Sequence, residues 1–261
     1  VTLDANAGTI SENPEVWTGS GSSATKTITY GTTYGTLPVP TRTGYTFLGW
    51  KYAEATIDET SNMFVSTSHT LTAEWQTNTY TVKFNKNGAD CGDLMADMTF
   101  TYDETVIPAN LFTFTGHKFL GWKVNNEGNI LTEGEINLSS KQGAVVELFA
   151  QWQIEKYNLT FNLNGGTIEL TIDGTYEYDQ ELPTNLTKVI DGKTYRFLGW
   201  SLTNEANPAT AQTYTNCPDI GEDGASATLY AMWTISDFDL TITLSNSDYA
   251  TYTIMTEEGT V

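Results

Sequence analysis

Basic residues are scarce in this sequence of 261 residues, which has 12 Lys and Arg against 32 Asp and Glu and a formal net charge of −20. A charge of this sign repels phosphate backbones and anionic lipid headgroups, so nucleic acid is not an expected partner. The acidic residues are scattered and form no run of five or six. We interpret them as a source of solubility, with a diffuse affinity for cations as the alternative.

Cysteine and histidine are nearly absent. Cys91 and Cys217 are the only cysteines, and they occupy unmatched positions in the sequence, so no disulfide framework can be inferred. His69 and His117 are the only histidines, and their separation excludes a His-x-x-x-His zinc pair. We expect two free thiols and two isolated surface or strand histidines.

Long hydrophobic runs are also missing. The longest apolar stretch covers residues 144–150, is interrupted by Glu147, and is far shorter than the roughly 20 residues of a membrane span. We therefore expect no membrane insertion within this segment. Because the sequence opens on Val1 without an initiator Met or an apolar leader, we expect it to begin inside a longer or processed protein.

Signatures of catalysis are lacking as well. There is no Gly-x-Ser-x-Gly or Cys-x-x-Cys motif, and residues 192–194 (Gly-Lys-Thr) lack the upstream Gly of a phosphate-binding loop. Residues 219–224 faintly resemble a calcium loop, but Tyr230 stands where a bidentate Glu is needed. The sequence predicts no catalytic residue, no cofactor and no metal site.

What is present is a repeat. The tetrapeptide Phe-Leu-Gly-Trp occurs at 47–50, 119–122 and 197–200. A second Trp follows each copy, and these closing tryptophans are 77 and then 81 residues apart: Trp75, Trp152 and Trp233. Three identical tetrapeptides in a matched context indicate tandem repeat units.

Each repeat reads as a series of short strands. Alternating apolar residues lead into an Asn- and Gly-containing turn at 6–8, 87–88 and 164–166, which is a strong hairpin signal. A Pro-containing connection then precedes the Phe-Leu-Gly-Trp strand, and no segment has a sustained helical period. We predict a mainly β fold of three small tandem domains, each a roughly four-stranded mixed sheet with little helix, arranged as an elongated array.

The predicted domains are residues 1–76, 77–153 and 154–234, with 235–261 as a partial further module or a C-terminal cap. The linkers at 76–79 and 153–156 are short, which predicts limited hinge motion between neighbours.

Six tryptophans recur at matched positions, and we expect them to anchor the cores of units near the lower size limit of a self-sufficient domain. Sugar-binding platforms are the alternative role for such residues. Trp17 differs, because it has no counterpart in the other repeats and lies beside the Ser- and Gly-rich residues 19–23. It is the one predicted ligand-contact residue. The glycines at 49, 121 and 199 predict a bulge or a close backbone approach.

These motifs resemble the Listeria-Bacteroides repeat, a relative of the internalin B-repeat, most clearly at 44–50 (Gly-Tyr-Thr-Phe-Leu-Gly-Trp) and 229–233 (Leu-Tyr-Ala-Met-Trp). The resemblance covers about 230 residues. It implies a β-grasp-like fold with at most a small helix, in secreted or surface-anchored bacterial proteins. Thr194 and His117 depart from the pattern of the other copies, which affects loop geometry rather than the fold.

The expected function is that of a non-catalytic stalk or spacer at the bacterial surface, with adhesion or protein interaction through sheet edges. Carbohydrate binding through loop aromatics such as Trp17 is the alternative, and an enzyme is the third class considered. The expected partner is an extracellular protein or glycan, and the chain is expected to be monomeric.

Overall fold

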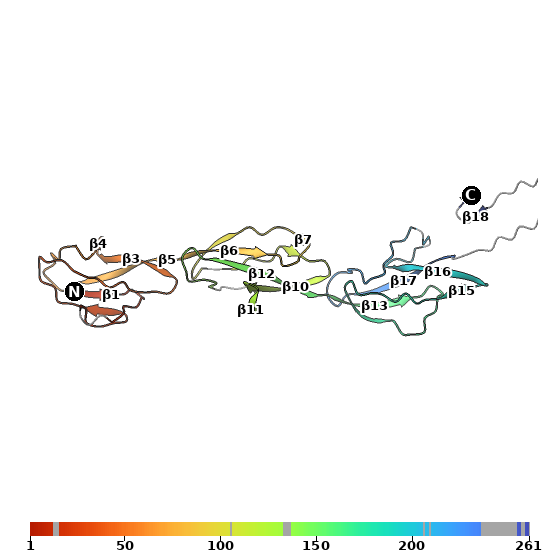
Figure 1. Ribbon diagram of the computed structural model, residues 1–261, viewed down its shortest axis with the longest axis horizontal. Helices are drawn as coiled ribbons and strands as arrows, with labels where there is room; N and C mark the ends of the chain where they lie inside the picture. The colour runs from red at the N-terminus through yellow and green to blue at the C-terminus, as the bar shows by residue number, and fades with distance from the viewer. Residues whose placement is uncertain are drawn as a thin grey trace, which may run out of the picture. The chain divides into compact units, whose positions relative to one another are not determined.

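The computed structural model contains one five-stranded mixed sheet for each repeat (Figure 1). The part of the chain that it describes has no helix, and therefore none long and apolar enough to cross a membrane. The mainly β fold of three repeats is confirmed, with five strands per sheet where about four were expected. The described residues are 1–12, 16–104, 106–132, 137–205, 207–208, 210–235, 255–256 and 259–260.

The first sheet has the strand order β2-β1-β5-β3-β4. The first strand pairs in parallel with the last, and every other pairing in the sheet is antiparallel. A parallel pair requires a crossover connection, and here the segment between the second and third strands provides it without a helix. The strands are β1 (Thr2–Asp4), β2 (Ser23–Thr25), β3 (Tyr45–Tyr52), β4 (Ala55–Ile57) and β5 (Thr70–Thr77).

The second sheet repeats this topology in the order β11-β10-β12-β6-β8. Its first and last strands again pair in parallel over five residues, with Thr81 opposite Val145 and Asn85 opposite Phe149. A two-stranded ribbon of β7 (Cys91–Gly92) and β9 (Phe112–Thr113) lies within the connections. The sheet strands are β6 (Thr79–Asn85), β8 (Met98–Thr101), β10 (His117–Val124), β11 (Glu127–Leu131) and β12 (Val145–Ile154).

The third sheet has the order β14-β13-β17-β16-β15 and differs at one edge. Its outer strand precedes the Phe-Leu-Gly-Trp strand in the sequence, whereas β4 and β11 follow theirs. The strands are β13 (Lys156–Asn162), β14 (Gly174–Glu177), β15 (Lys188–Ile190), β16 (Lys193–Ser201) and β17 (Ser226–Ile235). A hairpin of β18 (Met255–Thr256) and β19 (Gly259–Thr260) follows. The module or cap predicted at 235–261 otherwise lies outside the described residues.

Each Phe-Leu-Gly-Trp strand carries a β-bulge. The register against the last strand shifts between Phe47 and Gly49, and likewise at the two equivalent positions. The bulge glycines have φ values of 146°, 137° and 142°, a conformation that L side chains rarely adopt. The bulge predicted at Gly49, Gly121 and Gly199 is therefore confirmed.

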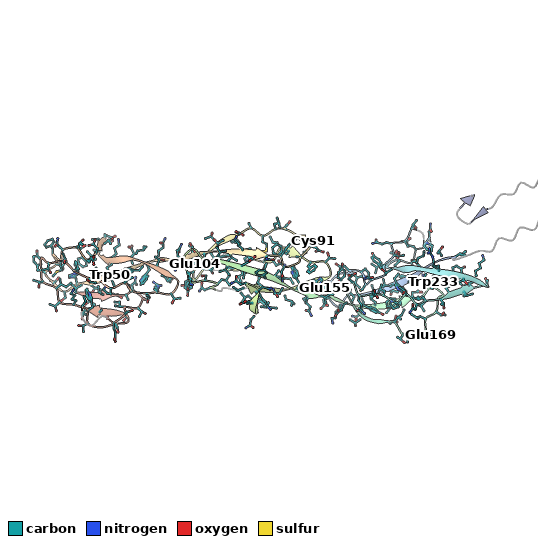
Figure 2. The ribbon with its side chains drawn as sticks, viewed as in Figure 1. Trp50, Cys91, Glu104, Glu155, Glu169 and Trp233 are labelled. Atoms are coloured by element: carbon teal, nitrogen blue, oxygen red, sulfur yellow. The ribbon has the colours of Figure 1, made fainter. Side chains whose placement is uncertain are left out.

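Three separate hydrophobic cores are formed, one in each repeat. Figure 2 shows Trp50 within the first repeat and Trp233 within the third. The chain divides into two compact units, Val1–Ile154 and Glu155–Val261, so the first two repeats share a unit. The residue limits given for the domains from the sequence stay a prediction. Between β5 and β6 there is only Asn78, and between β12 and β13 only Glu155.

Candidate functional site: the junction of the first two repeats

The recurrent tryptophans pack against other side chains of their own repeats. The first Trp of each pair is at most 2% exposed, whereas the closing Trp is buried only in the third repeat and half-buried in the others. The Phe of the tetrapeptide makes edge-on contacts with both indoles, at centroid distances of 5.2–5.6 Å. A core role is thus confirmed for four of the six: Trp50, Trp122, Trp200 and Trp233. Trp75 and Trp152 are only partly buried.

The closing tryptophan of each repeat also forms a hydrogen bond to the backbone at the first turn of that repeat. Each indole Nε1 donates a 3.0 Å hydrogen bond to a backbone carbonyl immediately before the turn Asn: Trp75 to Ala5, Trp152 to Lys86, and Trp233 to Leu163.

The turn asparagines provide a second repeated bond. Each has a left-handed φ between 46° and 48°, which Asn tolerates better than most residues. Each side-chain Nδ2 donates to an Ala carbonyl on the last strand of the repeat: Asn6 to Ala73 (3.1 Å), Asn87 to Ala150 (2.8 Å), and Asn164 to Ala231 (3.0 Å).

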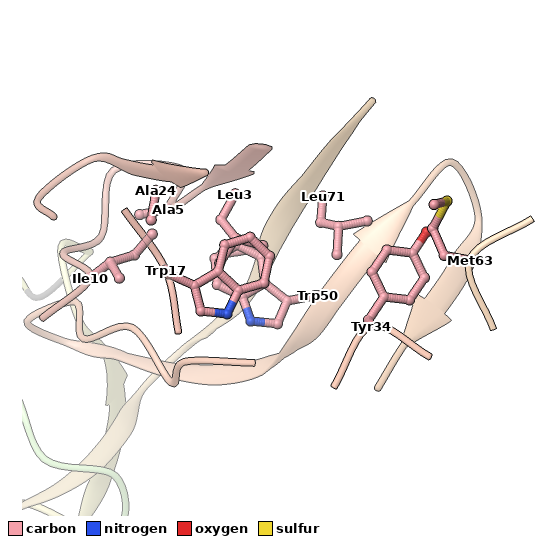
Figure 3. Close-up of a cluster of buried hydrophobic side chains, with 10 residues drawn as sticks. Leu3, Ala5, Ile10, Trp17, Ala24, Tyr34, Trp50, Met63 and Leu71 are labelled. Atoms are coloured by element: carbon pink, nitrogen blue, oxygen red, sulfur yellow. The ribbon is translucent and has the colours of Figure 1, made fainter. Parts of the chain in front are cut away.

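Trp17 is not the exposed contact residue that the sequence predicted. Its side chain is 1% exposed, and its Nε1 donates to the carbonyl of Thr36 at 2.8 Å. Figure 3 shows its indole, with that of Trp50, among the buried side chains of the first repeat. Trp17 packs into the core because burying an indole stabilises a small core more than exposing it. The expected surface position of Trp17 was therefore wrong, and an indole this deeply buried leaves no ring face open to a sugar.

The histidines serve structural contacts. His69 is buried, with Nε2 2.8 Å from the Tyr34 hydroxyl, and burial raises the pKa of that phenol. His117 on β10 stacks on Phe114 at a centroid distance of 3.9 Å. Both cysteines are free, as predicted, with Cys91 exposed (Figure 2).

Residues 219–224 form a turn around Tyr157 in the third repeat. The buried hydroxyl of Tyr157 shares its single proton between the carboxylates of Glu155 (2.8 Å) and Asp219 (3.1 Å), and Asp223 accepts from a backbone N–H. Burial, the bond to Glu155 and the charge of Asp219 raise the pKa of Tyr157. These carboxylates are thus occupied by turn contacts. Among the residues with a described placement, no three His, Cys, Asp or Glu side chains are grouped as metal ligands.

Two other groups have displaced pKa values. Burial raises the pKa of the Cys217 thiol to about 11, which keeps it protonated and unreactive at neutral pH. Hydrogen bonds from Cys91 and Thr115 lower the pKa of the exposed Asp90 carboxyl to about 2. Neither group lies in a cluster of catalytic type.

One polar site does join two repeats. Asn78, the single residue between β5 and β6, is 6% exposed. Its Oδ1 accepts from the Thr46 hydroxyl of the first repeat at 2.5 Å, and its Nδ2 donates to the Ser140 carbonyl of the second at 2.8 Å. Its backbone N–H donates to Gly44 and its carbonyl accepts from Tyr102, both at 2.9 Å. One buried side chain therefore bonds to both repeats.

Aromatic contacts surround this Asn78 junction. Tyr45 and Tyr102 meet edge to face at 6.1 Å, and the Tyr45 hydroxyl donates to Asp103 at 3.1 Å. The guanidinium of Arg42 stacks over the Tyr45 ring at 3.6 Å. Gly44 lies directly against Tyr102, where a Cβ would fall 2.2 Å from the ring. The close approach requires glycine at this position.

An open, mainly polar hollow of about 690 Å³ lies beside these contacts and is lined by residues of both repeats. It offers few apolar walls for a small molecule. The sequence signalled only a short linker at 76–79. Nothing in a single Asn between Thr residues indicated that it would be buried.

The comparisons with known proteins agree with the repeat organisation. The family model described as the Listeria-Bacteroides repeat domain matches residues 16–74, 80–151 and 157–232. Two proteins of Evansella cellulosilytica, provisionally named a membrane protein and a Gly-rich membrane protein, are 30% and 28% identical over 77% and 76% of this chain. The chain spans only 28% and 23% of the length of these relatives.

Among solved structures, Streptococcal High Identity Repeats in Tandem (SHIRT) domains 3-4 from a cell surface protein are similar at 17% identity. The match covers 61% of this chain and 99% of that one, with a TM-score of 0.18. Such a TM-score is too low to establish a common fold.

Proposed function

Because the chain belongs to the Listeria-Bacteroides repeat domain family, we propose that it is a non-catalytic stalk or spacer region of a bacterial cell-surface or secreted protein. The observation that carries the proposal is the Asn78 junction, where one buried side chain bonds to both repeats. A spacer needs neighbouring domains that keep a fixed orientation, and a buried, fully bonded polar residue favours one arrangement over others. All three family matches are to the same repeat domain.

A surface location is part of this proposal. It is supported by two relatives that carry provisional names as membrane proteins, and a net charge of −20 suits a soluble, exposed region. Antibodies against the chain should label intact cells of the producing bacterium. Labelling only after lysis would contradict the location and leave the spacer geometry untouched.

The spacer role predicts a narrow distribution of distances between the first two repeats. Spin labels on the native Cys91 and on a Val39→Cys variant, both exposed sites, report that distance by double electron–electron resonance. Asn78→Ala should broaden the distribution, because it leaves the Ser140 carbonyl and the Thr46 hydroxyl without this partner at a cost of about 1–3 kcal/mol.

The matched control is Asn129→Ala, since Asn129 is exposed on β11 and away from the junction. It should leave the distance distribution narrow. A broad distribution in the unmodified chain would show that the two repeats move independently, which would overturn the rigid-spacer role.

Adhesion is a second candidate, favoured by a different observation. Tyr30 and Phe64 are 61% and 64% exposed, yet their rings meet edge to face at 6.0 Å. The backbone bond from Gly31 to Met63 (2.9 Å) holds their two segments together. Exposed aromatic residues are enriched at the energetic centres of protein interfaces. We propose that this pair contacts an extracellular protein.

The adhesion role predicts that a Tyr30→Ser, Phe64→Ser double variant stays folded but binds at least about tenfold more weakly to its target, since interface anchors commonly contribute more than ~1.4 kcal/mol. Binding would be measured on arrays of purified extracellular-matrix proteins and of glycans. Leu94→Ser, which alters an apolar residue of the second repeat that is 87% exposed, is the control. Binding that the double variant retains, or binding to glycans alone, would contradict protein recognition at this pair.

A further inference from the structure

The first and last strands of each repeat are direct neighbours, and they run in parallel: β1 with β5, β6 with β12, and β13 with β17. Tension along the chain enters a repeat at the start of its first strand and leaves it at the end of its last. Two parallel neighbours pulled in this way slide past each other. All the hydrogen bonds of the ladder then carry the load together instead of opening one by one.

In the second repeat the loaded ladder covers five residue pairs, from Thr81 and Val145 to Asn85 and Phe149. Both strands are held from outside as well. β12 pairs with β10 over seven residue pairs, and β6 pairs with β8 over four. Neither loaded strand is free to peel away from its sheet.

The side chains that recur in all three repeats tie the same two strands together. In the second repeat Asn87 bonds from the turn after β6 to Ala150 on β12, and Trp152 on β12 bonds back to Lys86. The first repeat has the equivalent bonds from Asn6 and Trp75, and the third from Asn164 and Trp233. The turn Asn and the closing Trp thus add side-chain hydrogen bonds between the same two strands whose parallel ladder would be sheared by tension.

The connections between repeats leave no slack to absorb tension first. One residue separates β5 from β6 and one separates β12 from β13. Tension in one repeat therefore passes directly to the first strand of the next.

From this arrangement we infer that each repeat is a tension-bearing clamp, in which the parallel ladder, the turn Asn and the closing Trp together resist sliding of the first strand against the last. The inference rests on the proposed stalk role, because only a tethered spacer is pulled along its length. Beyond the stalk role, the turn Asn and the closing Trp of each repeat then have a tension-bearing function.

The test compares two directions of pulling on the same folded protein by single-molecule force spectroscopy. In the first, the full chain is held by tags at its two ends. In the second, it is held by the C-terminal tag and by a Lys118→Cys variant at an exposed site, with Cys91→Ser to leave one accessible thiol. Lys118 lies opposite Gln153 in the antiparallel pair of β10 and β12, so this second direction peels the pair from one end.

The third repeat is an internal reference, because it is loaded through β13 and β17 in both directions. In the second direction the two repeats are told apart by the length of chain that each releases, at ~3.5 Å per extended residue. Residues 118–154 then release about 130 Å and residues 156–235 about 280 Å, before the folded span is subtracted. In the first direction the second repeat is identified as the one whose unfolding force Asn87→Ala changes.

We expect the second repeat to unfold at a similar force to the third when the chain is pulled from its ends, and at a several-fold lower force when it is peeled from Lys118. Asn87→Ala should lower the end-to-end force of the second repeat and leave its peeling force unchanged, since Asn87 bonds across β6 and β12 only. Equal forces in the two directions would overturn the clamp. That outcome would leave the distance test of the Asn78 junction unaffected, so failure of the clamp and failure of the spacer role are distinguishable.

Discussion

Replacing Trp200 with alanine is expected to unfold the third repeat under conditions in which the first two stay folded. The indole is 0% exposed, contacts Phe161 and Phe197 at centroid distances of 4.6 and 5.3 Å, and donates to the carbonyl of Pro183 at 2.8 Å. Truncation of a buried Trp to Ala costs about 3–5 kcal/mol. A domain of about 75 residues has only roughly 4–11 kcal/mol of stability, so the loss is a large fraction of the total.

Hydrogen exchange with mass spectrometry checks this result, because it reports each segment separately. Amide protection should fall throughout 156–235 and persist in residues 1–154, since the third repeat has a core of its own. Leu170→Ala, at a residue 76% exposed, is the control and should change little. A loss of protection in all three repeats would mean that they share one cooperative interior.

The repeated motifs made the fold class predictable, because each motif has a local physical meaning. A Gly between Leu and Trp fits a bulge, and that expectation is confirmed. The Asn- and Gly-containing turns predicted tight hairpins, and this expectation was wrong, because the strand before each turn pairs with a strand that begins more than ten residues further along. The edge strand of the third repeat was not predictable in this way. In that repeat the edge strand β15 precedes β16 in the sequence. Either the segment before or the segment after the Phe-Leu-Gly-Trp strand can pair with its free edge, and the sequence pattern does not say which of the two pairs more stably.

The two main surprises, Trp17 and Asn78, share a cause. Sequence pattern describes a residue by its neighbours in the chain, whereas burial here comes from distant partners. Trp17 lies beside Ser and Gly residues that indicate a surface loop. It is nevertheless buried, because its indole packs in the core that contains Trp50 and donates a hydrogen bond to the carbonyl of Thr36. Asn78 is covered because Thr46 and Ser140 approach it from different repeats.

Alanine at the three bulge glycines should destabilise the repeats in the order Gly121, Gly199, Gly49. All three have φ between 137° and 146°, so an added side chain strains each backbone by about 1–3 kcal/mol. The space around them differs. A Cβ at Gly121 would lie 2.4 Å from the Leu131 carbonyl oxygen, and one at Gly199 would lie 2.9 Å from Thr213 Cβ. A Cβ at Gly49 would have the most room, with Thr56 Cγ2 3.4 Å away.

Gly49→Ala therefore isolates the backbone strain, and it serves as the matched control for the two crowded positions. Because β11 would have to move away from β10 to make room at Gly121, that variant should lose the pairing of Trp122 with Leu131 and exceed the strain cost alone. Denaturant titration followed by segment-resolved hydrogen exchange measures each repeat against its own unmodified state. Equal losses at all three positions would mean that φ strain sets the whole cost and that the tight packing of β11 on β10 contributes nothing.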